Sequence, residues 1–302
     1  MKKFLLILFI FIVIGYGCTN KQAPINEKTI INDENESLLS PNRFLNIAHR
    51  GASGYAPEHT IESYELGERM HGDYIEIDLQ MTKDGVLVAM HDMDVSRTTD
   101  HKGSIKELTI DDVEKLDAGS WFNEMNKDYA QPAFANAKVP TLDEIFETFG
   151  HESNYYIEIK TPEEYPNMVD ELLKTLEKHG FLRDDVPEGK VIIQSFHAES
   201  LQKVHQLNEN IPLIQLYRFD RTAAISEKEL QKVRSYAVGI GVNYKSLTKR
   251  FVEKVRANDL LIHAYTVNDE KEMRKLMNWG VTGIFTDYPD VLHEVIEEAK
   301  NI

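Results

Sequence analysis

The stretch EIDLQMTKDGVLVAMHD, residues 76–92, decides how this chain folds. Two apolar runs flank Asp84-Gly85, and only residues 82–85 separate one run from the other. Parallel strands need a crossover of a dozen residues or more, so these two runs must pair as an antiparallel hairpin. An Asp-Gly pair is typical of a two-residue hairpin turn.

From residue 44 to the C-terminus, short apolar runs alternate with amphipathic helical patterns, which is typical of parallel strands joined by helices. The predicted strands are Leu45–Ala48, Tyr74–Met81, Val86–Met90, Tyr155–Ile159, Val191–Gln194, Pro212–Leu216, Val238–Val242, Leu260–Tyr265 and Gly283–Phe285. The third run is the returning arm of the hairpin, so eight parallel strands remain. We predict a closed (β/α)₈ barrel, with an open doubly wound sheet as the alternative.

The predicted turn places polar side chains at the mouth of this barrel. With Asp84-Gly85 as the turn, position 78 lies opposite position 91, so we expect Asp78 and His91 to be neighbours. Glu76 lies on the same face of its strand, one pleat further down. These residues stand at the carboxyl end of a strand, where such barrels keep their active sites.

Two other predicted strands end in charged or titratable groups. His49 and Arg50 follow the first run, and Glu158 and Lys160 share one face of another. Each group has a purely structural explanation, because a lone histidine at a strand end is more often a core residue and Glu158 with Lys160 can be a simple ion pair. Together they converge on one mouth, and burying so many charges is costly unless they pair or bind a cation.

The chemistry of these groups points to cleavage of a phosphodiester. The carboxylates Glu76, Asp78 and Glu158 offer oxygen ligands, which suit Ca²⁺ or Mg²⁺. Two residues with fixed positive charge, Arg50 and Lys160, would hold an anion beside the metal. The histidines 49 and 91 titrate near neutral pH, as a general acid and a general base should.

The charge and the N-terminus bear on partners and location. A formal net charge of −16 argues against nucleic acid as a partner. Lys2 and Lys3 precede an uncharged run that ends at Cys18, which is too short to span a membrane and is typical of a secretory signal. We predict a signal peptide over residues 1–17.

The segment around the cysteine resembles a bacterial lipoprotein signal, which implies that Cys18 is lipidated and anchors an exported protein to the outer face of the cell membrane. Secretion after cleavage without lipidation is the alternative. The polar composition of residues 18–42 predicts a flexible tether. The barrel then occupies residues 43–302.

An ordered set of motifs runs through the predicted barrel: His49-Arg50-Gly51, Pro57-Glu58-His59-Thr60, Glu76-Ile77-Asp78, His91-Asp92, Arg97-Thr98-Thr99, Leu116-Asp117-Ala118-Gly119, Pro140-Thr141-Leu142-Asp143-Glu144, Ile157-Glu158-Ile159-Lys160 and Thr266-Val267-Asn268. In these motifs the chain resembles glycerophosphodiester phosphodiesterases, and the His59 form resembles secreted Gram-positive members. The resemblance implies a barrel of the phospholipase C-like type with a small insertion over about residues 91–139.

The resemblance also implies roles for individual residues. Metal ligands would be Glu76, Asp78 and Glu158, and the acid–base pair would be His49 and His91. The substrate would be held by Arg50, Lys160, Glu58, Gln194, Phe196 and Tyr265. The bound cation would be Ca²⁺ or, as the second choice, Mg²⁺.

The implied reaction is hydrolysis of glycerophosphodiesters to sn-glycerol 3-phosphate and an alcohol. Substrates would be small glycerophosphodiesters or glycerol-phosphate polymers of the cell wall. The nucleophile is either water or the neighbouring hydroxyl of the glycerol itself. Two alternatives stay open at this point: a non-catalytic binder of glycerophosphodiesters or teichoic-acid chains, and another phosphodiesterase of the phospholipase C-like type.

Overall fold

The structure is a computed structural model that describes residues 37–301. The predicted signal peptide, the predicted lipidation of Cys18 and residues 18–36 of the predicted tether lie outside these residues. No helix between residues 37 and 301 is both long and apolar enough to cross a membrane.

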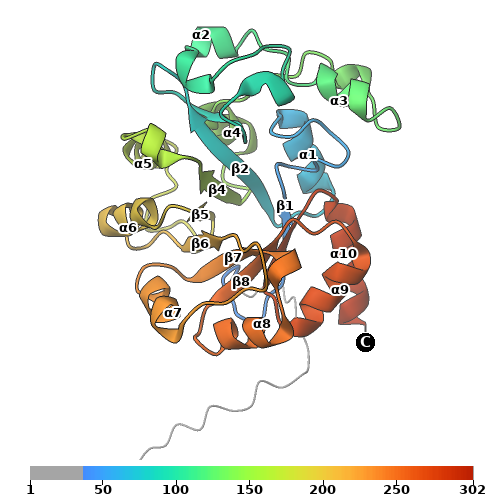
Figure 1. The fold of residues 1–302 in the computed structure, drawn as a ribbon. Helices are drawn as coiled ribbons and strands as arrows, with labels where there is room; N and C mark the ends of the chain where they lie inside the picture. The colour runs from blue at the N-terminus through green and yellow to red at the C-terminus, as the bar shows by residue number, and fades with distance from the viewer. Residues whose placement is uncertain (1–36, 302) are drawn as a thin grey trace, which may run out of the picture.

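Eight parallel strands close into a barrel, because β1 pairs with both β2 and β9 (Figure 1). Going around the barrel from β1, the strands follow the order β1, β2, β4, β5, β6, β7, β8 and β9. Their bounds are β1 Leu45–Ala48, β2 Tyr74–Met81, β4 Tyr155–Ile159, β5 Val191–Ser195, β6 Leu213–Tyr217, β7 Gly239–Asn243, β8 Leu261–Tyr265 and β9 Gly283–Thr286. The predicted closed barrel is confirmed.

A helix follows each barrel strand and covers the outside of the barrel (Figure 1). These helices are α1 Ile61–Arg69, α4 Leu142–Phe149, α5 Met168–Lys178, α6 Ala198–Leu207, α7 Glu227–Arg234, α8 Lys249–Arg256, α9 Glu270–Trp279 and α10 Pro289–Lys300. Their apolar faces and the outward side chains of the strands form the main hydrophobic core, which includes Ile77 of β2, Leu142 of α4 and Leu172 of α5. Two 3₁₀ turns, η4 Pro162–Glu164 and η5 Tyr244–Ser246, follow β4 and β7.

The hairpin of β2 and β3 (Leu87–Ala89) forms, but its register differs by one residue from the predicted register. Leu79 pairs with Ala89, and the Met90 amide donates to the Asp78 carbonyl at 2.9 Å. Position 78 therefore lies opposite position 90. The predicted pairing of Asp78 with His91 is wrong.

The length of the hairpin loop explains this error. The Thr82 amide donates to the Val86 carbonyl at 2.9 Å, which leaves a loop of residues 83–85. Gly85 ends this loop with φ +88°, the left-handed conformation that a three-residue hairpin loop requires at its last position. An Asp-Gly pair fits both kinds of loop, so the pattern alone does not distinguish them.

The insertion after β3 lies at one end of the barrel, with α2 Ile110–Val113 and α3 Ser120–Met125 beyond the strands (Figure 1). Short 3₁₀ turns complete it: η1 Val95–Arg97, η2 Ile105–Glu107 and η3 Pro132–Phe134. It has its own small core, in which Val88 and Met90 of the hairpin pack against Val95 and Leu116. The insertion is therefore anchored to the hairpin through apolar contacts.

Inside the barrel, alternate strand residues form a separate apolar layer near the amino ends of the strands. Its members are Leu45, Ile47, Tyr74, Tyr156, Ile192, Ile214 and Phe285. Leu38 and Leu39 pack against this layer, and Arg256 Nη2 donates to the Pro41 carbonyl at 2.7 Å. The last residues of the predicted tether therefore close the floor of the barrel, and the polar mouth lies at the opposite end.

Candidate active site

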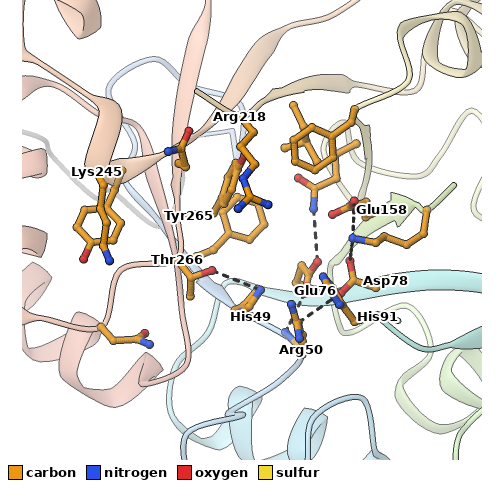
Figure 2. Close-up of a pocket in the computed structure, with 18 of the residues that line it drawn as sticks. His49, Arg50, Glu76, Asp78, His91, Glu158, Arg218, Lys245, Tyr265 and Thr266 are labelled. Atoms are coloured by element: carbon orange, nitrogen blue, oxygen red, sulfur yellow. Dashed lines mark hydrogen bonds and ion pairs between the residues drawn. The ribbon is translucent and has the colours of Figure 1, made fainter. Parts of the chain in front are cut away.

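A cavity of about 880 Å³ opens at the carboxyl ends of the barrel strands (Figure 2). It is lined by His49, Arg50, Glu76, Asp78, His91, Glu158, Lys160, Gln194, Phe196, Leu216, Arg218, Asn243, Tyr244, Lys245, Tyr265, Thr266, Asn268, Asp269 and Phe285. All residues that the sequence analysis predicted for the site line this cavity, except Glu58. Most lie at alternate positions of their strands, because successive strand side chains point to opposite faces.

The carboxylates Glu76, Asp78 and Glu158 form a buried cluster on β2 and β4. Asp78 and Glu158 are paired positions of these neighbouring parallel strands. Burial and the charge of Asp78 raise the pKa of Glu76 well above its usual value and raise that of Glu158 to about 8. This cluster therefore holds more negative charge than its surroundings readily accommodate.

Lys160 and Arg50 partly balance this cluster. Lys160 Nζ lies 2.9 Å from Glu158 Oε1 and 3.7 Å from Asp78 Oδ1. The Arg50 amide donates to Glu76 Oε2 at 2.8 Å, and Arg50 Nε lies 3.4 Å from Asp78 Oδ2. Burial alone would raise the pKa of Asp78, but the nearby positive groups outweigh burial and hold that pKa well below its usual value.

A metal ion fits the carboxylates of β2. One ligand atom from each of His59, Glu76 and Asp78 lies within 4.8 Å of the others, and all three side chains are buried. The buried Oε1 of Gln194 has no hydrogen-bond partner among residues 37–301, while its Nε2 lies 3.4 Å from Glu76 Oε1. Carboxylate and amide oxygens are the donors that hard divalent cations prefer. The residues present therefore suit a divalent cation.

His59 is a member of this group that the predicted ligand set did not include. Its Nε2 lies 2.9 Å from Asp78 Oδ2, and its Nδ1 lies 2.8 Å from the Tyr64 hydroxyl. Burial lowers the pKa of His59, which favours the neutral imidazole. A neutral ring held between Tyr64 and Asp78 fixes the direction of that carboxylate.

His49 lies on the rim beside a second carboxylate. Its Nδ1 lies 2.7 Å from Asp287 Oδ1, and Asp287 also accepts from the Ser53 hydroxyl at 2.9 Å and from Asn268 Nδ2 at 2.5 Å. Its Nε2 lies 3.5 Å from the Thr266 hydroxyl in the cavity lining. Nε2 is therefore the nitrogen of His49 available to a ligand.

Like His49, His91 pairs with an aspartate and lines the cavity, although the register of the hairpin differs from the predicted one. The strand ends at Ala89, so pleating no longer fixes the direction of His91, and the side chain lines the cavity. Its Nδ1 lies 2.6 Å from Asp92 Oδ1. Burial and the charges of Arg50 and Lys160 lower the pKa of His91 to about 4, against the opposite effect of nearby carboxylates. His91 is therefore neutral at neutral pH.

A chain of ion pairs connects this histidine to the arginine of the mouth. Asp92 pairs with Arg97 Nε, and the two terminal nitrogens of Arg97 each lie 2.8 Å from an oxygen of Glu58. Glu58 Oε1 also accepts from Arg50 Nη1 at 2.8 Å. Both oxygens of Glu58 are thus occupied by arginines and the residue does not line the cavity, which differs from its predicted contact with substrate.

The aromatic part of the cavity is formed by Phe196 and Tyr265. Phe196 is 46% exposed, and its ring meets the Tyr265 ring edge-on with centroids 6.2 Å apart. The Tyr265 hydroxyl donates to the Tyr217 carbonyl at 2.8 Å. Both predicted aromatic contacts therefore line the cavity.

A barrel mouth with a carboxylate cluster that suits a divalent cation, two cationic side chains and two histidines that each pair with an aspartate has the groups that phosphodiester cleavage requires. Comparison with known proteins agrees: residues 49–291 match the glycerophosphoryl diester phosphodiesterase family. The chain belongs to this family. It is an enzyme of the phosphoric diester hydrolase class, acting on glycerophosphodiesters.

Relatives cover nearly the whole barrel. A glycerophosphodiester phosphodiesterase of Bacillus subtilis is 51% identical over 259 residues, covering 86% of this chain and 88% of the relative. Another, from Caldanaerobacter subterraneus, is 33% identical and covers 84% of this chain and 98% of the relative. A phosphodiesterase structure from Oleispira antarctica, in complex with the product sn-glycerol-3-phosphate, has a TM-score of 0.73 at 27% identity and covers 83% of this chain and 96% of that structure.

The contact between His49 and Asp287 generates a prediction. We expect Asp287→Ala to lower kcat about a hundredfold, because the imidazole loses the group that orients it and a small misplacement of a catalytic group has an effect of this size. Asp287→Glu keeps a carboxylate that accepts from Nδ1–H and stabilises the imidazolium, so we expect it to stay within about tenfold of wild type. Steady-state kinetics on glycerophosphoglycerol measure both. Equal losses in the two variants would contradict a positioning role for Asp287.

Proposed function

We propose that the protein hydrolyses glycerophosphodiesters to sn-glycerol 3-phosphate and an alcohol in a reaction that depends on a bound divalent cation, with Ca²⁺ as the preferred ion. The observation that carries this proposal is the pair of histidines, 49 and 91, each with an aspartate on Nδ1, facing one cavity that also holds the carboxylate cluster. The relative from Oleispira antarctica, in complex with sn-glycerol-3-phosphate, supports the product.

The cation would be held by Glu76 and Asp78, with Glu158 and the free oxygen of Gln194 beside them. When bound, it supplies positive charge that stabilises negative charge on the phosphoryl oxygens. An all-oxygen set with several carboxylates suits the flexible coordination of Ca²⁺ better than the strict octahedron of Mg²⁺. His59 holds Asp78 in place through its Nε2.

The side chains of the mouth perform the binding and proton transfers. Arg50 and Lys160 bind non-bridging phosphate oxygens, since both line the cavity and remain positively charged. One of the two histidines, 49 or 91, accepts a proton from the attacking hydroxyl through Nε2. The other donates a proton to the leaving alkoxide, so that the alcohol leaves uncharged. The paired aspartates stabilise the imidazolium form in each case.

The substrates that we propose include glycerol-phosphate polymers of the cell wall as well as small glycerophosphodiesters. The wide mouth supports this, since a cavity of about 880 Å³ lies near the upper end of the usual range for ligand pockets. An exported enzyme would meet such polymers outside the membrane.

We expect His49→Ala and His91→Ala each to lower kcat on glycerophosphoglycerol by about 10²- to 10⁴-fold, because each removes one proton transfer. An sn-glycerol 3-phosphate ester of p-nitrophenol needs no acid to expel its leaving group. One of the two variants should therefore regain much of its activity on this ester, and that variant identifies the general acid.

The matched control for these variants is His101→Ala, since His101 is exposed in the insertion and does not line the cavity. It should turn over both substrates as wild type does. Near-wild-type turnover of glycerophosphoglycerol by either His49→Ala or His91→Ala would contradict the acid–base assignment.

Export and anchoring are proposed from the sequence around Cys18. The charged, then apolar start and the glycine before the cysteine support lipidation of Cys18. Radioactive palmitate should label the wild-type protein and not Cys18→Ser in the producing cell; equal labelling, or none in either, would contradict lipidation at this residue.

A further inference from the structure

The cavity has a second positively charged end, formed by Arg218 and Lys245, that the acid–base chemistry does not use. Arg218 directly follows β6 and Lys245 lies in η5 directly after β7, and both side chains line the cavity. Arg218 continues the alternation of β6, since Leu216, two positions earlier, also lines the cavity, whereas Lys245 reaches the cavity from η5 together with its neighbour Tyr244. Both cations therefore face the cavity.

These cations lie across the mouth from the carboxylate cluster. In the closed barrel of eight strands, β6 lies opposite β1, four strands away, and His49 and Arg50 directly follow β1. In the same way β7 lies opposite β2, which carries Glu76 and Asp78. Figure 2 shows Lys245 to the left of Tyr265 and the carboxylates to its right, with Arg218 drawn over Tyr265.

Arg218 and Lys245 differ from the other cations of the site in having no acidic partner. Arg50, Lys160 and Arg97 each form at least one ion pair with a carboxylate. Among residues 37–301, neither Arg218 nor Lys245 forms an ion pair within 4.0 Å, and both side chains are exposed. The positive charge of this end is therefore available to a ligand.

The acidic groups that line the cavity leave this charge in excess. Apart from the carboxylate cluster, the described lining contains one acidic residue, Asp269. Its carboxylate caps α9 by accepting from the Glu272 amide at 3.1 Å. Asn243 is also occupied, because its side chain bonds both backbone groups of Phe219.

Between the two charged ends lies the aromatic wall formed by Phe196 and Tyr265. These rings have no free charge to offer, and the Tyr265 hydroxyl is bound to a backbone carbonyl. The cavity thus offers charge, then apolar surface, then charge. A chain of phosphates separated by glycerol carbons has the same alternation.

We propose that Arg218 and Lys245 form a second anion subsite, which binds a second phosphodiester carried by the alcohol that leaves. The proposal rests on the proposed function and specifies its substrate class: glycerophosphodiesters whose leaving alcohol carries another phosphate. For bis(glycerophospho)glycerol, water adds to one phosphorus, the P–O bond to the central glycerol breaks, and that alkoxide takes a proton. The products are sn-glycerol 3-phosphate and glycerophosphoglycerol.

This subsite also sets a preference among head groups. A cationic leaving alcohol such as choline would be brought towards two positive side chains, whereas a phosphate would form charge-assisted hydrogen bonds with them. Because both cations are exposed, salt screens the interaction. The preference for a second phosphate should therefore shrink as ionic strength rises.

The test compares kcat/KM on bis(glycerophospho)glycerol with kcat/KM on glycerophosphoglycerol, which lacks the second phosphate. We expect Arg218→Ala/Lys245→Ala to lower the ratio of these two values at least tenfold at low salt, mainly through KM. Arg218→Lys keeps the charge and should keep most of the ratio. In the wild type, 0.5 M NaCl should lower the ratio towards that of the double variant.

The matched control is Lys228→Ala/Arg250→Ala, which removes the same charge from exposed positions on α7 and α8 outside the cavity. It should leave the ratio unchanged. An unchanged ratio in Arg218→Ala/Lys245→Ala, whether or not both activities fall together, would overturn the second subsite. Failure of the wild type to hydrolyse glycerophosphoglycerol would instead contradict the proposed function, so the two failures are distinguishable.

Discussion

The burial of Glu76 and Asp78 on one face of β2 is the constraint on which the rest of the site depends. Strand pleating directs both carboxylates into the barrel, and β4 adds Glu158 beside them. Burying like charges is unfavourable unless opposite charges or a cation compensate. Arg50 and Lys160 provide part of that compensation, His59 adds a hydrogen bond to Asp78, and a bound divalent cation would provide the remainder.

A chain of ion pairs that starts at Arg50, beside the buried carboxylates, connects the loop after β1 to the insertion after β3. Arg50 is held by Glu58, Glu58 by Arg97, and Arg97 by Asp92, the partner of His91. The insertion is thereby tied to the loop after β1 through charges, in addition to its apolar contacts with the hairpin. The two ends of this chain of ion pairs, Arg50 and the partner of His91, lie at side chains that line the cavity.

Much of this arrangement could be predicted from the sequence, because two periodicities carry it. Strand–helix alternation predicted the barrel, and the period of two placed Glu76 with Asp78 and Glu158 with Lys160. The hairpin register was wrong because an Asp-Gly pair suits loops of two and of three residues. The roles of His59 and Asp287 depend on contacts between distant segments, which no local pattern contains. Arg218 could have been found by applying the same period of two beyond β6, whereas Lys245 lies in η5, where that period no longer applies.

The most direct test of the central claim is the thermal unfolding temperature of wild type and Glu76→Gln, measured with and without Ca²⁺. A ligand that binds the folded state at a hundred times its Kd adds about 2.7 kcal/mol of stability. We therefore predict that Ca²⁺ raises the unfolding temperature of wild type by roughly 5 °C or more and leaves that of Glu76→Gln nearly unchanged. Without metal, the variant should be at least as stable as wild type because it lacks one buried charge. Equal responses of both proteins to Ca²⁺, or no response in wild type to either Ca²⁺ or Mg²⁺, would contradict a carboxylate cluster built to hold a cation.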